Sequence, residues 1–389
     1  MRERLIDELR QIKETGNYRE IKYLKPVNAS RVQHDGREFL NLCSNSYLSL
    51  HLHPEVMRAA RDALDAYGAG TCSSRSVSGS IDLYAALERE TASFKGYRKA
   101  LIFSNGYLAN MGIIATLTGA HDVIFSDELN HSSIIDSTRL SRARTVVYRH
   151  RDVEDLEEKI ERENPDTRKF VITESVFSMD GDVAPLRDIY ALKLEYGLHV
   201  ILDEAHATGV FGAGGKGVEE LLGLTGRMDV QMGTFGKALG SFGAFALGDA
   251  VTIDYLVNRA RTFMYTTALP ASSLAASGAA LRLITESTGF RNDLWENIAY
   301  MRQRLLHLGF DLKQSQGPII PIVVGDDHKA VEAQRLLMDR GIFLQAIRPP
   351  TVPPGTSRLR LTVVRALSHA DMDEALEALQ HVGKEVGLI

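Results

Sequence analysis

The sequence is poor in cysteine and has no long apolar run, and each absence excludes a class of protein. Cys43 and Cys72 are the only cysteines among 389 residues, which excludes a disulfide scaffold and a cysteine-rich metal site. No apolar run reaches the length of about 18 residues that a membrane span needs. The opening MRERLIDELR is charged and lacks the apolar core of a secretory signal, so we expect a cytoplasmic protein without a metal.

The sequence also lacks an excess of positive charge. It has 45 Lys+Arg against 50 Asp+Glu, a net charge of −5, which argues against nucleic-acid binding through bulk charge. Hydrophobic residues make up 44% of the chain, which is enough to form packed cores and excludes general disorder. At roughly 150 residues per domain, the length predicts two or three domains.

Strand-like and helix-like segments alternate through the middle of the chain. Short runs rich in Val, Ile and Phe are separated by segments with helical spacing of apolar residues. This alternation predicts an α/β fold whose mostly parallel sheet is covered by helices on both faces. The predicted strands are KALIF, DVIFSD, RTVVY, KFVITES, HVILDEA and GAFALG.

The two ends of the chain show other patterns. Leu5, Leu9 and Ile12 are spaced as one face of a helix, and Asp35-Gly36 predicts the turn of a hairpin. The C-terminal part predicts a smaller α+β domain with the strands PIIPIVVG, GIFLQAI and SRLRLTV. We expect an N-terminal helix and hairpin segment over 1–47, a large domain over 48–285 and a small domain over 286–389.

Two charged residues stand out at strand ends, where parallel sheets bind their ligands. Asp203 ends the run HVILD, and a buried carboxylate there needs a cation or a helix start as its partner. Lys237 lies among small residues between Phe235 and Phe242. An amine enclosed in this way is poorly hydrated, which suits a nucleophile that forms a Schiff base. A salt-bridged Asp203 and a surface-loop Lys237 are the structural alternatives.

Four further positions are candidates for a ligand site. The segment Ser104–Tyr107 joins a strand to a helix, where free N–H groups bind phosphate or the residues form an ordinary cap. Thr234 is a candidate phosphate donor near Lys237. His131 follows a strand and could stack on an aromatic cofactor or be structural, and Ser178 could serve a cofactor or only a turn.

A glycine-rich segment, GAGGKG at 212–217, matches the dinucleotide-binding pattern G-x-G-x-x-G. That pattern requires a strand immediately before it and an acidic strand end about 20 residues later, and both are missing here. We interpret the segment as a turn, and a nicotinamide-dependent dehydrogenase remains a remote alternative.

The order of these features resembles the pyridoxal-phosphate-dependent enzymes of fold type I and, more narrowly, the α-oxoamine synthase family. The resemblance covers almost the whole chain. It implies a large domain with a mostly parallel seven-stranded sheet, a smaller α+β domain, pyridoxal 5'-phosphate and a homodimer with the site at the subunit interface. The segments that carry it are LCSNSYLSL, SNGYLAN, DELNHSSIID, VFSMDGD, DEAHATGVFG, GTFGKALGSFG and AIRPPTVPPGTSRLRLT.

The resemblance also implies roles around the cofactor. Lys237 would form the Schiff base and move a proton, and Asp203 would keep the pyridine nitrogen protonated. His131 would stack on the ring, and His206 would hydrogen-bond the ring oxygen. The other implied cofactor-binding residues are Gly106, Tyr107, Ser178, Glu204, Ala205, Thr234, Phe235, Gly236, and Thr266 and Thr267 near the neighbouring subunit's phosphate.

The implied reaction is a decarboxylative condensation of L-alanine with pimeloyl-CoA or the carrier-protein ester, as in biotin biosynthesis. Arg360 would bind the alanine carboxylate, whereas Arg358 fits a solvated edge-strand residue if the two alternate faces. Arg19 would bind the distal acyl carboxylate, with Arg348 as its competitor. The other implied substrate-binding residues are Asn45, Ser74, His131 and Thr351.

The sequence departs from the family pattern at a few positions, which leaves the substrate open. Ser49 stands where Gly is usual, and Glu204 and Ala207 stand where Asp and Gly are commoner. The rival is 2-amino-3-oxobutyrate coenzyme A ligase, which uses glycine and acetyl-CoA, although RPPTVPPGTSRLRLT favours the alanine reaction. Serine palmitoyltransferase and 5-aminolevulinate synthase are more remote. A non-catalytic regulator would need a DNA-binding domain, for which the chain has no spare segment.

Overall fold

The computed structural model describes residues 1–389, which form two compact units. The large unit comprises residues 48–178 and 183–291, and the small unit comprises 1–47, 179–182 and 292–389. The division near the C-terminus falls between Arg291 and Asn292, inside helix α12 (Gly289–His307), where the sequence had suggested 285/286. The segment Met179–Asp182 belongs to the small unit although the chain around it lies in the large one.

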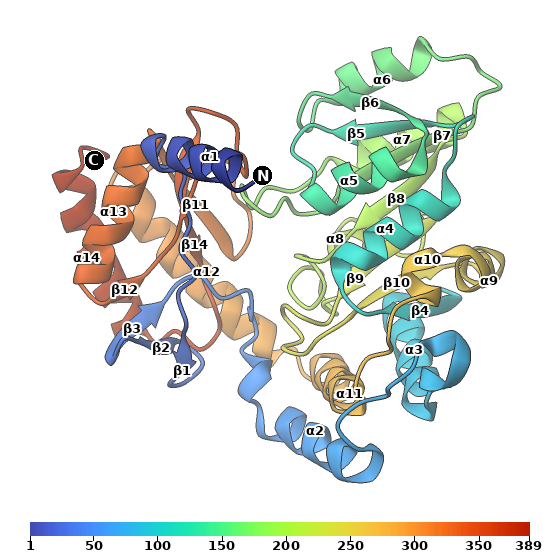
Figure 1. Ribbon diagram of the computed structural model, residues 1–389, viewed down its shortest axis with the longest axis horizontal. Coiled ribbons are helices and arrows are strands. Elements are labelled where there is room, and N and C mark those ends of the chain that lie inside the picture. The colour runs from blue at the N-terminus through green and yellow to red at the C-terminus, as the bar shows by residue number, and fades with distance from the viewer. The chain divides into compact units, whose positions relative to one another are not determined.

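The large unit is built on a seven-stranded sheet, which confirms the predicted α/β fold (Figure 1). The strand order is β4-β10-β9-β8-β7-β5-β6, and only β10 runs antiparallel to its neighbours. Continuous apolar runs suit such a sheet because both of its faces are covered. The strands are β4 (Lys99–Phe103), β5 (Val123–Asp127), β6 (Arg144–Tyr148), β7 (Lys169–Glu174), β8 (His199–Asp203), β9 (Val230–Thr234) and β10 (Ala244–Gly248).

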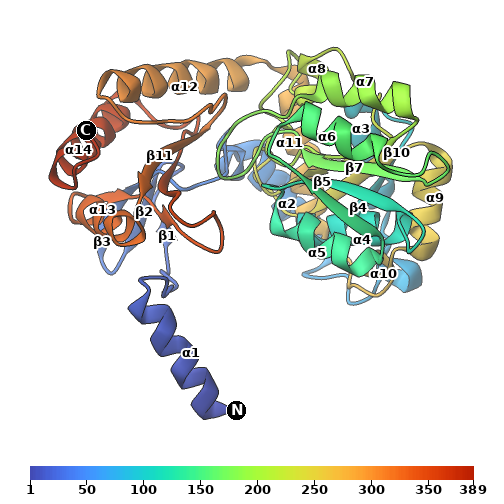
Figure 2. The ribbon, with the colours of Figure 1, turned by 90° about the horizontal axis from the view of Figure 1, so that it is seen from above.

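Helices cover both faces of this sheet. In Figure 2, α6 and α7 lie on one side of the strands and α4 and α5 on the other. Ile113, Ile124, Ile172 and Phe263 belong to one buried apolar cluster beneath α4. The helices are α2 (Pro54–Tyr67), α3 (Asp82–Lys95), α4 (Gly106–Leu117), α5 (Ser132–Ser141), α6 (Val153–Glu161), α7 (Leu186–Tyr196), α8 (Val218–Leu221), α9 (Ala250–Arg259), α10 (Arg261–Met264) and α11 (Ala271–Glu286), with single turns at Leu50–Leu52 and Arg75–Gly79.

The small unit combines the two ends of the chain in two sheets. In the first, β1 (Lys25–Pro26), β2 (Arg31–His34) and β3 (Arg37–Asn41) form an antiparallel meander, and β3 pairs in parallel with β12 (Ile342–Phe343). The predicted hairpin at Asp35-Gly36 is thus present. The second sheet has the order β11 (Ile319–Gly325), β14 (Ser357–Thr362), β13 (Ala346–Ile347).

The helices of the small unit agree with the periodic segments of the sequence. They are α1 (Arg2–Glu14), α13 (Asp327–Asp339), α14 (His369–Glu385) and most of α12. Ser368 and Asp371 form a capping box at the start of α14, in which each side chain accepts from the other residue's backbone N–H. None of the helices combines the length and the apolar character that crossing a bilayer requires.

Candidate active site

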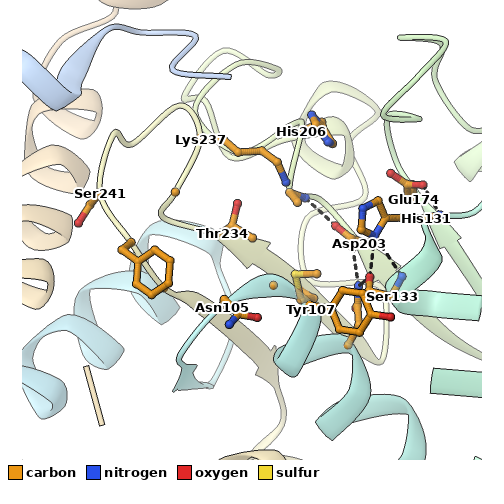
Figure 3. A pocket seen from close by; sticks show the side chains of 17 residues that line it. Asn105, Tyr107, His131, Ser133, Glu174, Asp203, His206, Thr234, Lys237 and Ser241 are labelled. Atoms are coloured by element: carbon orange, nitrogen blue, oxygen red, sulfur yellow. Dashed lines mark hydrogen bonds between the residues drawn. The ribbon is translucent and has the colours of Figure 1, made fainter. Parts of the chain in front are cut away.

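A pocket of the large unit lies where β7, β8 and β9 end (Figure 3). Its volume of about 270 Å³ is close to the lower end of the range of small-molecule sites. Strand-end residues, the first turn of α4 and the start of α5 all contribute to its wall. Among the sequence-predicted residues, the pocket is lined by Gly106, Tyr107, His131, Asp203, Ala205, His206, Thr234, Gly236 and Lys237.

Asp203 is held rigidly at the end of β8. One carboxylate oxygen accepts a hydrogen bond from Asn110 Nδ2 on α4 at 2.8 Å, and the other accepts from the Ala205 backbone N–H at 2.8 Å. The side chain is largely buried but lines the pocket. A fixed carboxylate of this kind is suited to bind a cationic ring N–H of a ligand.

Glu174 ends the neighbouring strand β7 and is paired in register with Asp203. Burial and the nearby Asp203 carboxylate raise the pKa of Glu174 well above its usual value. One oxygen of Glu174 accepts a hydrogen bond from the His131 backbone N–H at 2.7 Å. A raised pKa favours the neutral acid, so the two adjacent side chains avoid placing two full charges together.

His131 caps the start of α5 with its ring open to the pocket. Its Nδ1 lies 2.8 Å from Ser133 Oγ and accepts from the Ser133 backbone N–H at 3.2 Å. Incomplete hydration of the enclosed ring lowers the pKa of His131, the Asp203 carboxylate partly offsets this, and Lys237 adds to the lowering. The ring is therefore neutral near pH 7, which leaves a flat face for stacking.

Lys237 follows β9 and reaches into the same pocket (Figure 3). The sequence predicted that Phe235 and Phe242 enclose it, but only Phe242 lines the pocket together with Lys237. Phe235 is fully buried against Phe245, with 5.0 Å between ring centroids, whereas Phe242 is 52% exposed at the pocket wall. Lys237 is half-buried, so its amine is accessible to a ligand.

The wall of the pocket also offers hydrogen-bond donors that have no partner in the protein. Thr234 Oγ1 is buried and has no hydrogen-bond partner. Gly106 begins α4, so its N–H and that of Tyr107 belong to the first turn, whose donors lack partners within the helix. A Cβ at Gly106 would lie 2.9 Å from Thr234 Cγ2, so glycine leaves the space between them open. These donors fit a phosphate group.

Several predicted cofactor-binding residues do not line this pocket. Glu204, the first residue after β8, is fully buried and pairs with Lys95 instead of lining the pocket. In this position the Glu204 side chain does not reach a ligand in the pocket. Phe235 and Ser178 are buried outside the lining.

Thr266, Thr267 and Ser74 also lie outside the pocket. Ser74 and Thr267 form an antiparallel bridge, and the Thr267 carbonyl accepts from Ser104 Oγ at 3.4 Å. Thr267 is exposed and Thr266 is half-buried. The two threonines therefore do not serve the pocket of their own chain.

The small unit brings Arg360 and Asn45 together, as the sequence had grouped them. Both terminal nitrogens of Arg360 lie 3.2 Å from Asn45 Oδ1, and one donates to Thr362 Oγ1 at 3.0 Å. The expectation that Arg358 is a solvated edge-strand residue is wrong. It lies on the central strand β14, is 1% exposed and binds Asp180 at 2.6 Å, because residues two apart share a strand face.

Arg19, Arg348 and Thr351 also meet in the small unit. Arg19 donates to the Pro349 carbonyl at 3.2 Å and lies 3.5 Å from Thr351 Oγ1. Arg348 donates to the carbonyls of Gly16 and Tyr18, while its buried Nε has no partner. Both residues border one pocket, where burial and, second to it, repulsion by Arg19 lower the pKa of Arg348.

Among the residues that line the main pocket, sequence reasoning missed Glu174, Asn110 and Ser133, whereas Asn105 belongs to the predicted helix-start segment. Glu174 carried the same signal as Asp203, a carboxylate that ends an apolar strand, and could have been found in that way. Asn110 and Ser133 lie within helices, and only tertiary packing turns them toward Asp203 and His131. Asn105 caps α4 by accepting from the Leu108 N–H at 3.0 Å.

The inventory of the pocket fits pyridoxal phosphate. Lys237 supplies an amine, Asp203 a carboxylate for the ring nitrogen and His131 a flat neutral ring, and the hydroxyl of Thr234 is a buried donor without another partner. All of these groups belong to the large unit.

Comparisons with known proteins support this assignment. A family model described as aminotransferase class I and II matches residues 37–379. The curated 8-amino-7-oxononanoate synthase of Citrifermentans bemidjiense is 45% identical over 385 residues, which are 98% of this chain and 99% of that protein. The protein of the same name from Lysinibacillus sphaericus is 40% identical over 389 residues, with 100% of both chains covered.

Solved structures show the same relationship. Serine palmitoyltransferase from S. paucimobilis with a bound PLP–myriocin aldimine has a TM-score of 0.94 and 30% identity, and covers 99% of this chain and 98% of its own. The crystal structure of 8-amino-7-oxononanoate synthase from Francisella tularensis has a TM-score of 0.76 and 28% identity, over 90% of this chain and 98% of its own.

Proposed function

Because the chain belongs to the aminotransferase class I and II family and, within it, to the α-oxoamine synthases, we propose that it catalyses the 8-amino-7-oxononanoate synthase reaction. In this reaction L-alanine condenses with a pimeloyl thioester, and carbon dioxide and the thiol are released. The observation that carries the proposal is the convergence of Lys237, Asp203, His131 and Thr234 on one pocket. The relatives of this name, 40% to 45% identical over nearly the whole chain, support the choice of reaction.

Pyridoxal phosphate is the cofactor, and when bound it supplies an electron sink that stabilises negative charge on the α-carbon of an amino acid. Asp203, fixed by Asn110 and Ala205, would keep the ring nitrogen protonated. His131 would stack on the ring as a neutral imidazole. Thr234 and the first turn of α4 would hold the phosphate.

Lys237 would carry out the proton transfer of the reaction. Its amine would hold the cofactor covalently and would serve as the base that takes the proton from the α-carbon of the amino acid. The lysine follows β9 directly, so its position is defined by a rigid strand. His206, near the start of the segment between β8 and α8, would hydrogen-bond the ring oxygen from the pocket wall.

Two groups of residues in the small unit bind the substrates. Arg360, held by Asn45 and Thr362, binds the alanine carboxylate, for which a fixed guanidinium is suited. Arg19, with Arg348 beside it and Thr351 in contact, binds the carboxylate at the far end of the acyl chain.

We also propose a cytoplasmic homodimer. The exposed Thr267 and its neighbour Thr266 lie outside the pocket of their own chain, which supports a role toward a neighbouring subunit's phosphate. Sedimentation of the cofactor-loaded protein as a monomer under assay conditions would contradict this part of the proposal.

A second candidate, the condensation of serine with a long-chain acyl thioester, is favoured by the TM-score of 0.94 to serine palmitoyltransferase. The test offers the protein L-alanine, glycine or L-serine with pimeloyl-CoA, pimeloyl carrier protein, acetyl-CoA or palmitoyl-CoA. We expect thiol release and a product of the mass of 8-amino-7-oxononanoate with alanine and a pimeloyl thioester. Lys237→Ala is the control and should give none. Turnover only with glycine and acetyl-CoA, or only with serine and palmitoyl-CoA, would reassign the reaction within the family.

A further inference from the structure

The glycine-rich turn Gly212–Gly217, which resembles a nucleotide-binding loop in sequence, closes on two carboxylates of its own chain. The backbone N–H groups of Gly214 and Lys216 donate to one oxygen of Glu220, at 2.9 Å and 3.0 Å. The Gly217 end of the turn lies against the carboxylate of Glu204. The donors that would bind a phosphate in a nucleotide site are thus already used within the protein.

Glu204 is the centre of a buried ion pair behind the pocket. It lies 2.8 Å from Lys95 Nζ, and neither side chain is exposed. The second oxygen of Glu204 accepts from the Glu219 backbone N–H at 3.0 Å, and Lys95 also donates to the Lys216 carbonyl. We call Lys95, Glu204, Lys216, Gly217 and Glu219 the Glu204 anchor.

The anchor leaves no space for a side chain at Gly217. The backbone of Gly217 has φ = +119°, and a Cβ there would overlap the Glu204 carboxylate. Gly217 is therefore required by both its conformation and its contact. The turn can close on Glu204 only with glycine at this position.

The anchor also holds the backbone that carries the reactive side chains. Glu204 directly follows Asp203, and its N–H donates to the Met232 carbonyl on β9 at 2.8 Å. Asp203 and His206 face the pocket from this backbone, while Glu204 fixes it from behind. A buried pair of this kind contributes little net stability, so its use lies in defining one arrangement.

We propose that Glu204, locked between Lys95 and Gly217, is a positioning residue that sets the orientation of Asp203 and His206 toward the cofactor. This inference rests on the proposed function. The glycine-rich turn and Glu204 do not line the pocket, and this inference gives both of them a role in positioning the residues that do.

The test compares Gly217→Ala with Gly223→Ala. Gly223 also has a positive φ, of +72°, but a Cβ there meets nothing within 4 Å, so both variants carry backbone strain and only one disturbs Glu204. The measurements are the dissociation constant of pyridoxal phosphate from each apoprotein and the pH midpoint of the visible band of the loaded protein. Circular dichroism and the melting temperature establish that each variant is folded.

We expect Gly217→Ala to weaken cofactor binding roughly tenfold, the scale on which residues behind a ligand act, and to shift the pH midpoint of the band. Gly223→Ala should retain both wild-type values. Equal affinities and midpoints in folded Gly217→Ala and Gly223→Ala would overturn the proposal. If Gly217→Ala does not fold, the same two measurements are made on Glu204→Asp. This variant keeps the negative charge, but its shorter side chain moves the carboxylate away from Lys95, and we expect the same loss of affinity and the same shift of the midpoint. Wild-type protein that binds no pyridoxal phosphate would instead refute the proposed function.

Discussion

At the scale of single residues, we propose that Arg19 decides which acyl substrate is accepted. Arg19 is exposed at a pocket of the small unit, whereas Arg348 holds the backbone carbonyls of Gly16 and Tyr18. A carboxylate at the far end of the acyl chain would gain a charge-assisted bond to Arg19, and a methyl group would not.

We therefore expect Arg19→Ala to raise the KM for a pimeloyl thioester about tenfold, as loss of one hydrogen bond to a charged group predicts. The KM for a monocarboxylate thioester of the same length should change little, and kcat should be retained for both. Arg348→Ala is the matched variant and should raise the KM for the pimeloyl thioester less than Arg19→Ala does, because it loosens the segment that carries Arg19 but leaves the Arg19 guanidinium in place. Equal effects of Arg19→Ala on the two thioesters would remove Arg19 from the acyl site.

Sequence reasoning identified the pocket residues by two local signals, the end of an apolar strand and a lysine among small residues. Asp203 was identified by the first signal and Lys237, with Thr234 near it, by the second, and the structure brings them to one pocket. Asn110 was missed because a helix-interior asparagine carries no local mark of what it faces. Arg358 was misjudged because its partner, Asp180, is distant in sequence and cannot be inferred from the strand pattern.

At the scale of elements, the short helix α8 introduces a buried acid beside the Glu204 anchor. Glu219 accepts hydrogen bonds from Tyr97 at 3.0 Å, from the Met228 N–H at 3.3 Å and from Gln231. Burial, with the neighbouring Glu204 carboxylate adding to it and Lys95 opposing it, raises the pKa of Glu219 from 4.5 to about 7.

A raised carboxyl pKa in the folded state means that the folded protein binds the proton more tightly than the unfolded chain. The contribution of Glu219 to stability is then complete below pH 4.5 and is lost as the pH rises through about 7. We expect urea denaturation to show that the free energy of unfolding of the wild-type protein is lower at pH 7.5 than at pH 5. In Glu219→Gln this difference should be smaller. Glu296→Gln, at an exposed position, is the control. An unchanged pH dependence in Glu219→Gln would contradict this account.

The strands of the large sheet could be predicted where apolar runs were continuous, and one strand shows why others could not. The strand β9 reads VQMGT and was not among the predicted strands. Its Gln231 is polar because it reaches the buried Glu219, and a Cβ at Gly233 would overlap the ring of Phe245. Both exceptions to the strand pattern have long-range causes, which local periodicity does not contain.

At the scale of the whole molecule, the two units join segments that are far apart in the chain. The N-terminal strand β3 pairs with β12, and Met179–Asp182 is tied to the small unit by the bond between Asp180 and Arg358. No local pattern marks either pairing, so the sequence predicted the elements better than their grouping. The proposed function depends above all on Lys237 as the residue that holds pyridoxal phosphate covalently.

Reduction of the cofactor-loaded protein with borohydride, followed by proteolysis and mass spectrometry, tests this claim most directly. We expect a pyridoxyl group on Lys237 and on no other lysine, and we expect the group and the visible band to be absent in Lys237→Ala. Attachment to a different lysine, or a colourless protein that takes up NADH instead, would contradict it.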